Sequence, residues 1–96
     1  MKIELSARAQ GDIRSIAAYT RKTYSLNQAD RYIDALYQMM KKIADQPGLG
    51  HVRPDIPMTC KAISCNRHVI VYTVSNNTVY VVRVLHDQFD FKKHDL

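Results

Sequence analysis

The chain has 96 residues, of which 46% are hydrophobic and 24% charged, values typical of soluble globular proteins. This length suits one domain over residues 1–96 and excludes separate catalytic and regulatory domains. The formal net charge of +5 fits an acidic partner, nucleic acid or protein, although many soluble proteins are simply basic. No apolar run could span a bilayer, and the first residues lack the apolar segment of a secretory signal. We therefore expect a cytoplasmic protein without membrane contact.

The first half of the chain predicts a short strand and two helices. Residues 2–5 alternate between polar and apolar side chains, as in a half-buried strand, and Ser6 suits the N-cap of the next helix. Apolar residues then recur with a helical period in two segments, one ending at Tyr24 and one running from Asn27, the expected second N-cap, to Gln46. The two stripes are Ile13, Ile16, Ala17, Thr20 and Tyr24, and then Ala29, Tyr32, Ile33, Leu36, Met40, Ile43 and Ala44. The short break between the segments predicts an antiparallel helical hairpin.

The second half predicts a loop over residues 47–59, which holds all three prolines, and then strands at 60–65, 68–74 and 78–86. β-Branched residues and tyrosine dominate the last two strands, and Asn76-Asn77 suits a two-residue turn between them. The predicted fold class is α+β, in the order β-α-α-β-β-β, with the helical hairpin packed on one face of a small antiparallel sheet.

A turn at Asn76-Asn77 pairs Val74 with Val79 and decides which side chains of the hairpin share a face. One face then holds His68, Ile70, Tyr72, Val74, Val79, Val81, Arg83 and Leu85. The other holds Val69, Val71, Thr73, Tyr80, Val82 and Val84, with Arg67 and His86 beyond them. The larger side chains of the first set suit the gap beneath the helices, so the four valines of the second should be exposed and should bind a partner. A longer turn would exchange the two faces.

Few residues carry recognisable chemistry. The four histidines show no metal-ligand spacing and no nucleophile motif occurs, so we expect no metal, no cofactor and no catalytic residues. Cys60 and Cys65 are five positions apart on a predicted strand, hence on opposite faces, and should remain free thiols. Arg83 interrupts an apolar strand. It either pairs with Asp12 or Asp34 of the helices or binds a phosphate or carboxylate of a target.

Six sequence pieces, in order, cover nearly the whole chain. They are L-S-x-x-A-x-x-D-I-x-x-I-x-x-Y from Leu5 to Tyr19, A-x-x-Y from Ala29, P-x-L-G from Pro47 to Gly50 with Arg53 after it, H-V-I-V-Y from His68, R-V-L-H from Arg83, and Asp90. In these pieces the chain resembles the ParE toxins of the RelE/ParE superfamily, the toxic half of bacterial type II toxin–antitoxin pairs. The resemblance implies the fold already predicted, DNA gyrase as the target, and a ParD-like antitoxin that neutralises the toxin. It also implies contact with operator DNA only through the antitoxin complex, and inhibition rather than catalysis.

The resemblance and the predicted faces together give two sets of candidate residues. The target-binding candidates are Lys61, Arg83, His86, Phe89, Asp90 and Phe91. The antitoxin-binding candidates are Ile16, Tyr24, Tyr37, Val69, Val71 and Val82. The tail after His86 carries an aromatic pair and several cationic side chains, and is either a mobile tip that contacts the target or a frayed terminus.

Two other functions stay open. The first is a RelE-like ribosome-dependent endoribonuclease that uses a basic cluster of Lys61, Arg67, Arg83 and His86. The second is a non-toxic member that only represses its own operon together with the antitoxin. A nuclease needs cations for the phosphate, yet Val69 and Asp87 stand where basic residues would be expected, and Lys61 replaces the usual arginine. These departures favour the ParE-like function.

Overall fold

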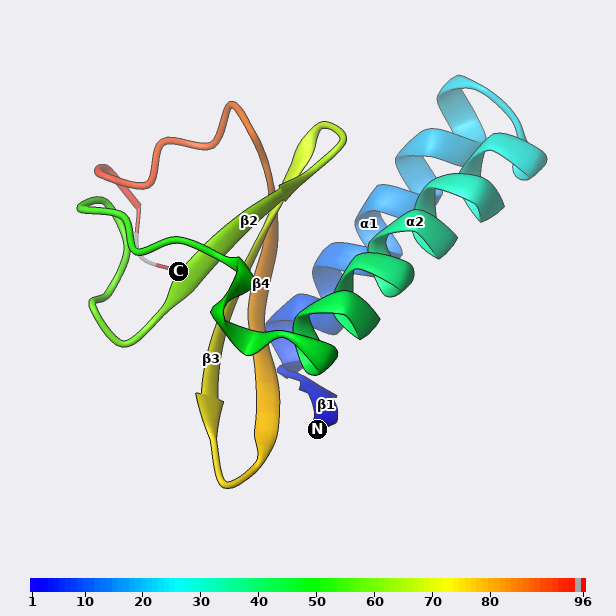
Figure 1. Ribbon diagram of the computed structural model, residues 1–96. Helices are drawn as coiled ribbons and strands as arrows, with labels where there is room; N and C mark the ends of the chain where they lie inside the picture. Colours follow the sequence, from blue (N-terminus) through cyan, green and yellow to red (C-terminus); the bar gives the residue numbers. More distant parts are fainter. Residues whose placement is uncertain (95) are drawn as a thin grey trace.

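The observed elements follow the predicted order. The computed structural model describes residues 1–94 and 96, and shows two helices on one face of a four-stranded sheet (Figure 1). The elements are β1 (Lys2–Leu5), α1 (Ala7–Thr23), α2 (Leu26–Asp45), the 3₁₀ helix η1 (Pro47–Leu49), β2 (Lys61–Cys65), β3 (His68–Ser75) and β4 (Thr78–His86). The predicted α+β fold is therefore confirmed. None of the described helices has the length and apolar character needed to cross a membrane.

The sheet is mixed, with the strand order β1-β4-β3-β2. The last three strands are antiparallel, whereas β1 runs parallel to β4 and pairs only with its first half, from Thr78 to Val81. Within the described residues, α1 rather than a strand flanks the second half of β4. There the hydroxyl of Ser6 donates to the carbonyl of Val82 at 2.7 Å, and the carboxylate of Asp12 accepts from the amide of Val84 at 2.9 Å. These two side chains satisfy backbone groups that a neighbouring strand would otherwise pair.

Serine side chains begin both helices. The Ser6 hydroxyl accepts the Ala9 amide at 3.0 Å, as predicted. The prediction of Asn27 as the second N-cap is wrong, because Ser25 accepts the amide of Gln28 at 3.0 Å. Ser25 has the extended backbone that an N-cap requires. The second helix consequently starts two residues earlier than expected, and the connection between the helices is tight.

The turn between β3 and β4 has the predicted form. Asn76 and Asn77 both have positive φ, 52° and 56°, a conformation that asparagine tolerates better than most residues. Two residues with positive φ give the twist that suits a two-residue hairpin. Val74 pairs with Val79 as expected.

A β-bulge changes the register in the middle of this hairpin. Tyr72 pairs with Val81, but the preceding Val71 pairs with Arg83, so Val82 has no partner in β3. An extra residue in one strand exchanges the faces of all residues beyond it. The predicted faces therefore hold from the turn as far as Val82 and are exchanged for Val84 and Leu85.

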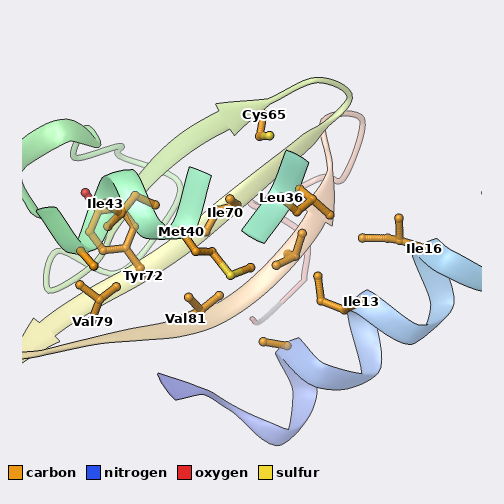
Figure 2. Packing of buried hydrophobic residues seen from close by; sticks show 13 residues of the cluster. Ile13, Ile16, Leu36, Met40, Ile43, Cys65, Ile70, Tyr72, Val79 and Val81 are labelled. Carbon is orange, nitrogen blue, oxygen red and sulfur yellow. The ribbon is translucent and has the colours of Figure 1, made fainter. Parts of the chain in front are cut away.

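The main core lies between the helices and the sheet (Figure 2). Its buried residues are Ala9, Ile13, Ile16, Leu36, Met40, Ile43, Ala44, Cys65, Ile70, Tyr72, Val79, Val81 and Val84. Ile70 and Tyr72 lie beneath the helices as predicted. The placement of Leu85 beneath the helices is wrong, because the bulge turns it to the opposite face and brings Val84 inward.

The opposite face of the sheet has a second, smaller core. It is formed by Ile56, Cys60, Ala62, Val69, Val71, Leu85 and Phe91, with Val82, Phe89 and Leu96 packed at its margin. In Figure 1 the loop before β2 and the tail after β4 lie together on the side of the sheet away from the helices. Val69 and Val71 are only 4% and 0% exposed. The prediction of an exposed valine face is therefore wrong, because the chain folds its own loop and tail over this face.

The turn after α2 packs closely against the side chain of Tyr72 in β3. A Cβ on Gly50 would lie 2.6 Å from the hydroxyl oxygen of Tyr72, so only glycine fits there. That hydroxyl accepts from the Gly50 amide at 2.8 Å and donates to the Pro47 carbonyl at 2.7 Å, which ties the turn after α2 to β3.

Cys60 and Cys65 are free and buried in different cores, on opposite faces as predicted.

Candidate functional site

A cleft of about 610 Å³ opens between the helices and the end of the sheet where β3 begins and β4 ends. It is lined by Ser15, Ile16, Tyr19, Thr20, Tyr24, Gln28, Tyr32, Arg67, His68 and His86. Tyr19 and Tyr24 are 66% and 70% exposed, so the helices contribute aromatic surface that solvent reaches. The sheet contributes two imidazoles, and the turn between β2 and β3 contributes the guanidinium of Arg67. The cleft therefore combines an aromatic wall with a polar rim, the composition of a binding site.

Tyr32 joins α2 to the sheet inside this cleft. Its hydroxyl accepts from the Arg67 amide at 3.1 Å and lies 2.5 Å from Nδ1 of His68. With the amide already donating to it, we assign the hydroxyl proton to the bond with Nδ1, so that His68 is neutral and carries its proton on Nε2. The His68 ring packs edge-to-face on Tyr32 and on His86, with centroids 5.4 and 5.3 Å apart.

Burial keeps both partners of this hydrogen bond uncharged. It lowers the pKa of His68 below the usual 6.5, and the nearby His86 lowers it further, while Asp87 and Asp12 act in the opposite direction. Burial also raises the pKa of Tyr32 above its usual 10.0. Neutral forms of both groups are thus favoured near pH 7.

We expect the protein to lose stability as the pH falls below 6.5. Between the lowered pKa of folded His68 and the pKa near 6.5 of the unfolded chain, the unfolded state binds more protons, so the free energy of unfolding rises with pH in that window. His68→Gln should remove this part of the slope. Urea unfolding of both proteins at a series of pH values measures it. The same slope in both proteins would assign the effect to another group.

The rim of the cleft is partly neutralised. The carboxylate of Asp87 lies 3.5 Å from Nε of Arg67 and 3.1 Å from Nδ1 of His86. The Arg67 side chain is 70% exposed, so this ion pair contributes little to stability. Its effect is to reduce the positive charge that the rim presents to a ligand.

Arg83 forms an ion pair with Asp12 of α1. Its Nε and Nη2 donate to the two carboxylate oxygens at 2.7 and 2.8 Å, and one of these oxygens also accepts the Val84 amide. Both side chains are 13% exposed. This hydrogen bonding raises the pKa of Arg83 above its already high usual value. Of the two acids predicted as partners, Asp12 is the one that binds Arg83, so the guanidinium has its charge matched within the chain.

The tail after β4 is folded onto the sheet. Phe91 is 8% exposed, and the guanidinium carbon of Arg53 lies 4.8 Å from its ring centroid. Arg53 is held in turn by two hydrogen bonds to Asp55, at 2.9 and 2.6 Å, and these bonds lower the pKa of Asp55. Within the described residues, the tail is therefore packed on the sheet through Phe91.

The end of the tail is held by further contacts. The carboxylate of Asp90 accepts from the amides of Lys92 and Lys93 at 3.0 and 3.3 Å, which closes a turn. Arg8 at the start of α1 donates to a terminal oxygen of Leu96. The contact with Arg8 places Leu96 beside the first turn of α1. Within residues 1–94 and 96, no three His, Cys, Asp or Glu side chains gather as metal ligands.

Comparison with known proteins identifies the family. A family model described as ParE toxin of the type II toxin-antitoxin system parDE matches residues 3–91. The chain belongs to the ParE toxin family. It is 29% identical over 90 residues to toxin ParE1 of Caulobacter vibrioides, covering 94% of this chain and 93% of that one. It is also 29% identical over 87 residues to toxin ParE of Escherichia coli, covering 90% and 84%.

Solved structures show the same fold. A chain of the chromosomal ParDE TA system from P. aeruginosa superposes with a TM-score of 0.79 at 12% identity, covering 90% of this chain and 95% of that one. The YoeB-YefM complex from Staphylococcus aureus gives a TM-score of 0.59 at 17% identity, with the same coverages. At such identities the likeness establishes the RelE/ParE-like fold alone. By sequence and by fold, this protein is the ParE-type toxin of a type II toxin–antitoxin system.

The structure divides the target-binding candidates of this toxin into separate groups. Lys61 pairs with Tyr72 at the start of β2, whereas His86 pairs with His68 at the far end of the sheet. Phe91 is buried and Arg83 is matched by Asp12. His86 and Asp90 are exposed and Phe89 is half-buried, so these three are the accessible candidates near the tail.

The basic cluster of the alternative nuclease is not assembled. Arg67 and His86 line the same cleft. Lys61 lies at the opposite end of β2, and the charge of Arg83 is matched by the carboxylate of Asp12. The four side chains therefore do not converge on one place where a scissile phosphate could be bound.

The antitoxin-binding candidates also separate. Ile16 and Tyr24 line the cleft, and Tyr37 lies in a different groove on the helices. Val69 and Val71 are covered by the loop and tail. Tyr19, which is exposed in the cleft, was not among the predicted site residues, and Tyr32 was predicted only as part of a core stripe. The helical period gave no signal for Tyr19, because a residue five positions before Tyr24 does not lie on the same face of a regular helix.

Proposed function

We propose that this toxin stops growth by binding and inhibiting DNA gyrase, and that it acts by binding rather than by catalysis. Membership of the ParE family over residues 3–91 is the observation that carries this proposal. The geometry supports it, because Lys61 lies at the other end of β2 from Arg67 and His86, and the guanidinium of Arg83 is already paired with Asp12. A phosphodiester-cleaving site would need such cations together.

The partner that neutralises the toxin is, in this proposal, a ParD-like antitoxin that occupies the aromatic cleft. An amphipathic helix laid into a groove buries apolar side chains at helical spacing. The exposed rings of Tyr19 and Tyr24 and the floor at Ile16 offer the matching surface. The buried Val69 and Val71 are reached only where the tail is displaced. Operator DNA is contacted through the complex of the two proteins and not by the toxin alone.

The surface that contacts gyrase, in this proposal, is the outer side of the folded tail. Phe89 is half-buried, with its ring packed edge-to-face on Phe91 at 5.0 Å between centroids. Lys92, Lys93 and His94 beside it are exposed. An aromatic anchor surrounded by exposed charges is typical of binding hot spots.

Two single substitutions should separate the two partners. Phe89→Ala is expected to weaken inhibition of DNA supercoiling by purified gyrase about tenfold, a typical hot-spot loss, with antitoxin affinity unchanged. Tyr24→Ala is expected to weaken antitoxin binding about tenfold, with inhibition of gyrase unchanged. Met58, which is 89% exposed on the loop before β2, provides the matched control, since Met58→Ala removes an exposed apolar side chain outside both surfaces. Thermal melts confirm that each variant is folded.

Several outcomes would contradict the proposal. Full supercoiling activity in the presence of excess wild-type toxin would exclude gyrase as the target. Cuts in messenger RNA on ribosomes after induction without antitoxin would favour the nuclease. If Phe89→Ala and Met58→Ala inhibit gyrase equally well, the tail has no role in target binding.

A further inference from the structure

We propose that the part of the chain that covers the second face of the sheet opens as a unit while the helices and the sheet stay folded. This cover consists of the loop at residues 52–58 and the tail at residues 88–94 and 96, which lie together on the side of the sheet away from the helices (Figure 1). When it opens, the folded toxin presents an apolar sheet face that the closed form hides. The proposal is independent of the gyrase and antitoxin assignments.

The two faces of the sheet have separate cores. The main core packs the helices on one face (Figure 2), the second core packs the cover on the other, and no described residue belongs to both. The second core is the smaller of the two, so less apolar burial holds the cover in place. Parts of a protein that share few contacts open separately, with free energies below that of global unfolding. The second core can therefore be lost while the main core remains.

The cover is bounded by three backbone groups that are bonded to the rest of the chain. They are the His51 backbone, which pairs with Ala62, the Thr59 carbonyl, which accepts from the Thr73 hydroxyl at 2.8 Å, and the Asp87 amide, which donates to the Arg67 carbonyl at 2.9 Å. Between these anchors the backbone forms local turns, such as Ile56 to Arg53 at 3.4 Å and Lys93 to Asp90 at 3.3 Å. Opening therefore breaks few backbone hydrogen bonds to the sheet, the bonds that protect a segment from local opening.

Side chains of the loop and the tail hold each other. Phe91 of the tail is 8% exposed and Ile56 of the loop is 6% exposed, both in the second core. The guanidinium carbon of Arg53, from the loop, lies 4.8 Å from the Phe91 ring centroid. Because the two segments pack on each other as well as on the sheet, we expect them to leave together. The open form then exposes Val69 and Val71.

The chain carries a natural probe for each core. Cys60 belongs to the second core and Cys65 to the main core, and both are free thiols. They are 6% and 7% exposed, so the closed structure shields them equally. A difference between their labelling rates consequently reports a difference between the opening of the two cores.

The test labels the full-length toxin with iodoacetamide without denaturant, under conditions in which closing is faster than labelling. Trypsin cleaves after Lys61, between the two cysteines, so mass spectrometry reads each thiol separately. Cys60 is expected to react about tenfold or more faster than Cys65.

Two variants, one in each core, test the order of opening. Ile13→Val, in the main core, should accelerate the labelling of Cys65 about fivefold and leave Cys60 unchanged. Phe91→Leu should accelerate the labelling of both thiols, since both local and global opening lose the packing of that ring. Circular dichroism checks that each variant is folded. If Phe91→Leu does not fold, wild type and Ile13→Val alone decide the question.

Three results would overturn the proposal. Equal labelling of the two cysteines, with Ile13→Val accelerating both, would show that the chain opens as a single cooperative unit. Faster labelling of Cys65 would show that the helices leave the sheet first. Fast labelling of Cys60 that Phe91→Leu leaves unchanged would show that the reagent reaches this thiol by another route while the cover stays closed.

Discussion

Replacing Arg83 by alanine is expected to lower the free energy of unfolding by about 3–5 kcal/mol, the usual result of breaking a buried ion pair from one side. The substitution leaves the Asp12 carboxylate, 13% exposed, with a hydrogen bond from the Val84 amide but without its cation. That carboxylate also joins α1 to the half of β4 that β1 does not reach. The loss should therefore loosen the packing of the helix on the sheet as well as the pair itself.

Urea unfolding of Arg83→Ala, Asp12→Ala and the double variant measures the effect. Each single variant leaves the other partner unpaired. The double variant should therefore lose less free energy of unfolding than the sum of the two single losses. Toxicity should fall in parallel with stability. An Arg83→Ala protein that melts like wild type but no longer arrests growth would assign Arg83 to target binding instead. Additive single effects would show that the two side chains do not interact.

Replacing Phe91 by alanine is expected to cost about 3–5 kcal/mol of stability, as for other buried phenylalanines. Phe91 fills the centre of the second core, where it packs with Ile56 and the sheet. It also takes the guanidinium of Arg53 on its ring. The cavity left by alanine would open the face that holds Val69 and Val71.

Phe89→Ala is the matched control for this experiment, because it removes the same ring from a half-buried position two residues away. It should destabilise the protein much less. Removal of residues 89–96 should reproduce the loss seen for Phe91→Ala and expose apolar surface to a hydrophobic dye. Unchanged melting of the truncated protein would show that the tail adds nothing to the fold. For this reason, single substitutions in the tail are better probes of target binding than truncation.

Much of the fold could be predicted from the sequence because it depends on short-range patterns. The helical stripes reflect the requirement that one side of each helix be buried, and they correctly include Ile13 and Ile16 of α1 and Leu36 of α2. The turn at Asn76-Asn77 follows from the tolerance of asparagine for positive φ. The register near that turn, with Val74 opposite Val79, then follows by counting.

The candidate site could be predicted only in part. The sequence indicated a family, an acid partner for Arg83, and Tyr24 and Ile16 as surface for a partner. It did not indicate the cleft itself, because Tyr19, Tyr32 and His68 come from three elements that meet only after the hairpin packs on the sheet. Distances between such elements are not encoded in any local pattern.

The sequence by itself determined the helices and strands, their order and the hairpin turn. The spacing of apolar residues and the tolerance of asparagine for positive φ both act within a few residues of the chain. Tertiary structure alone decided the bulge at Val82, which reverses the faces of Val84 and Leu85. Tertiary structure also decided where the tail packs. Residues after His86 are mostly polar, and nothing local marks Phe91 as buried. Its burial depends on a sheet face that the helices leave uncovered and on a loop that meets the tail there, because apolar surface exposed by one part of a chain is covered by whichever other part can reach it.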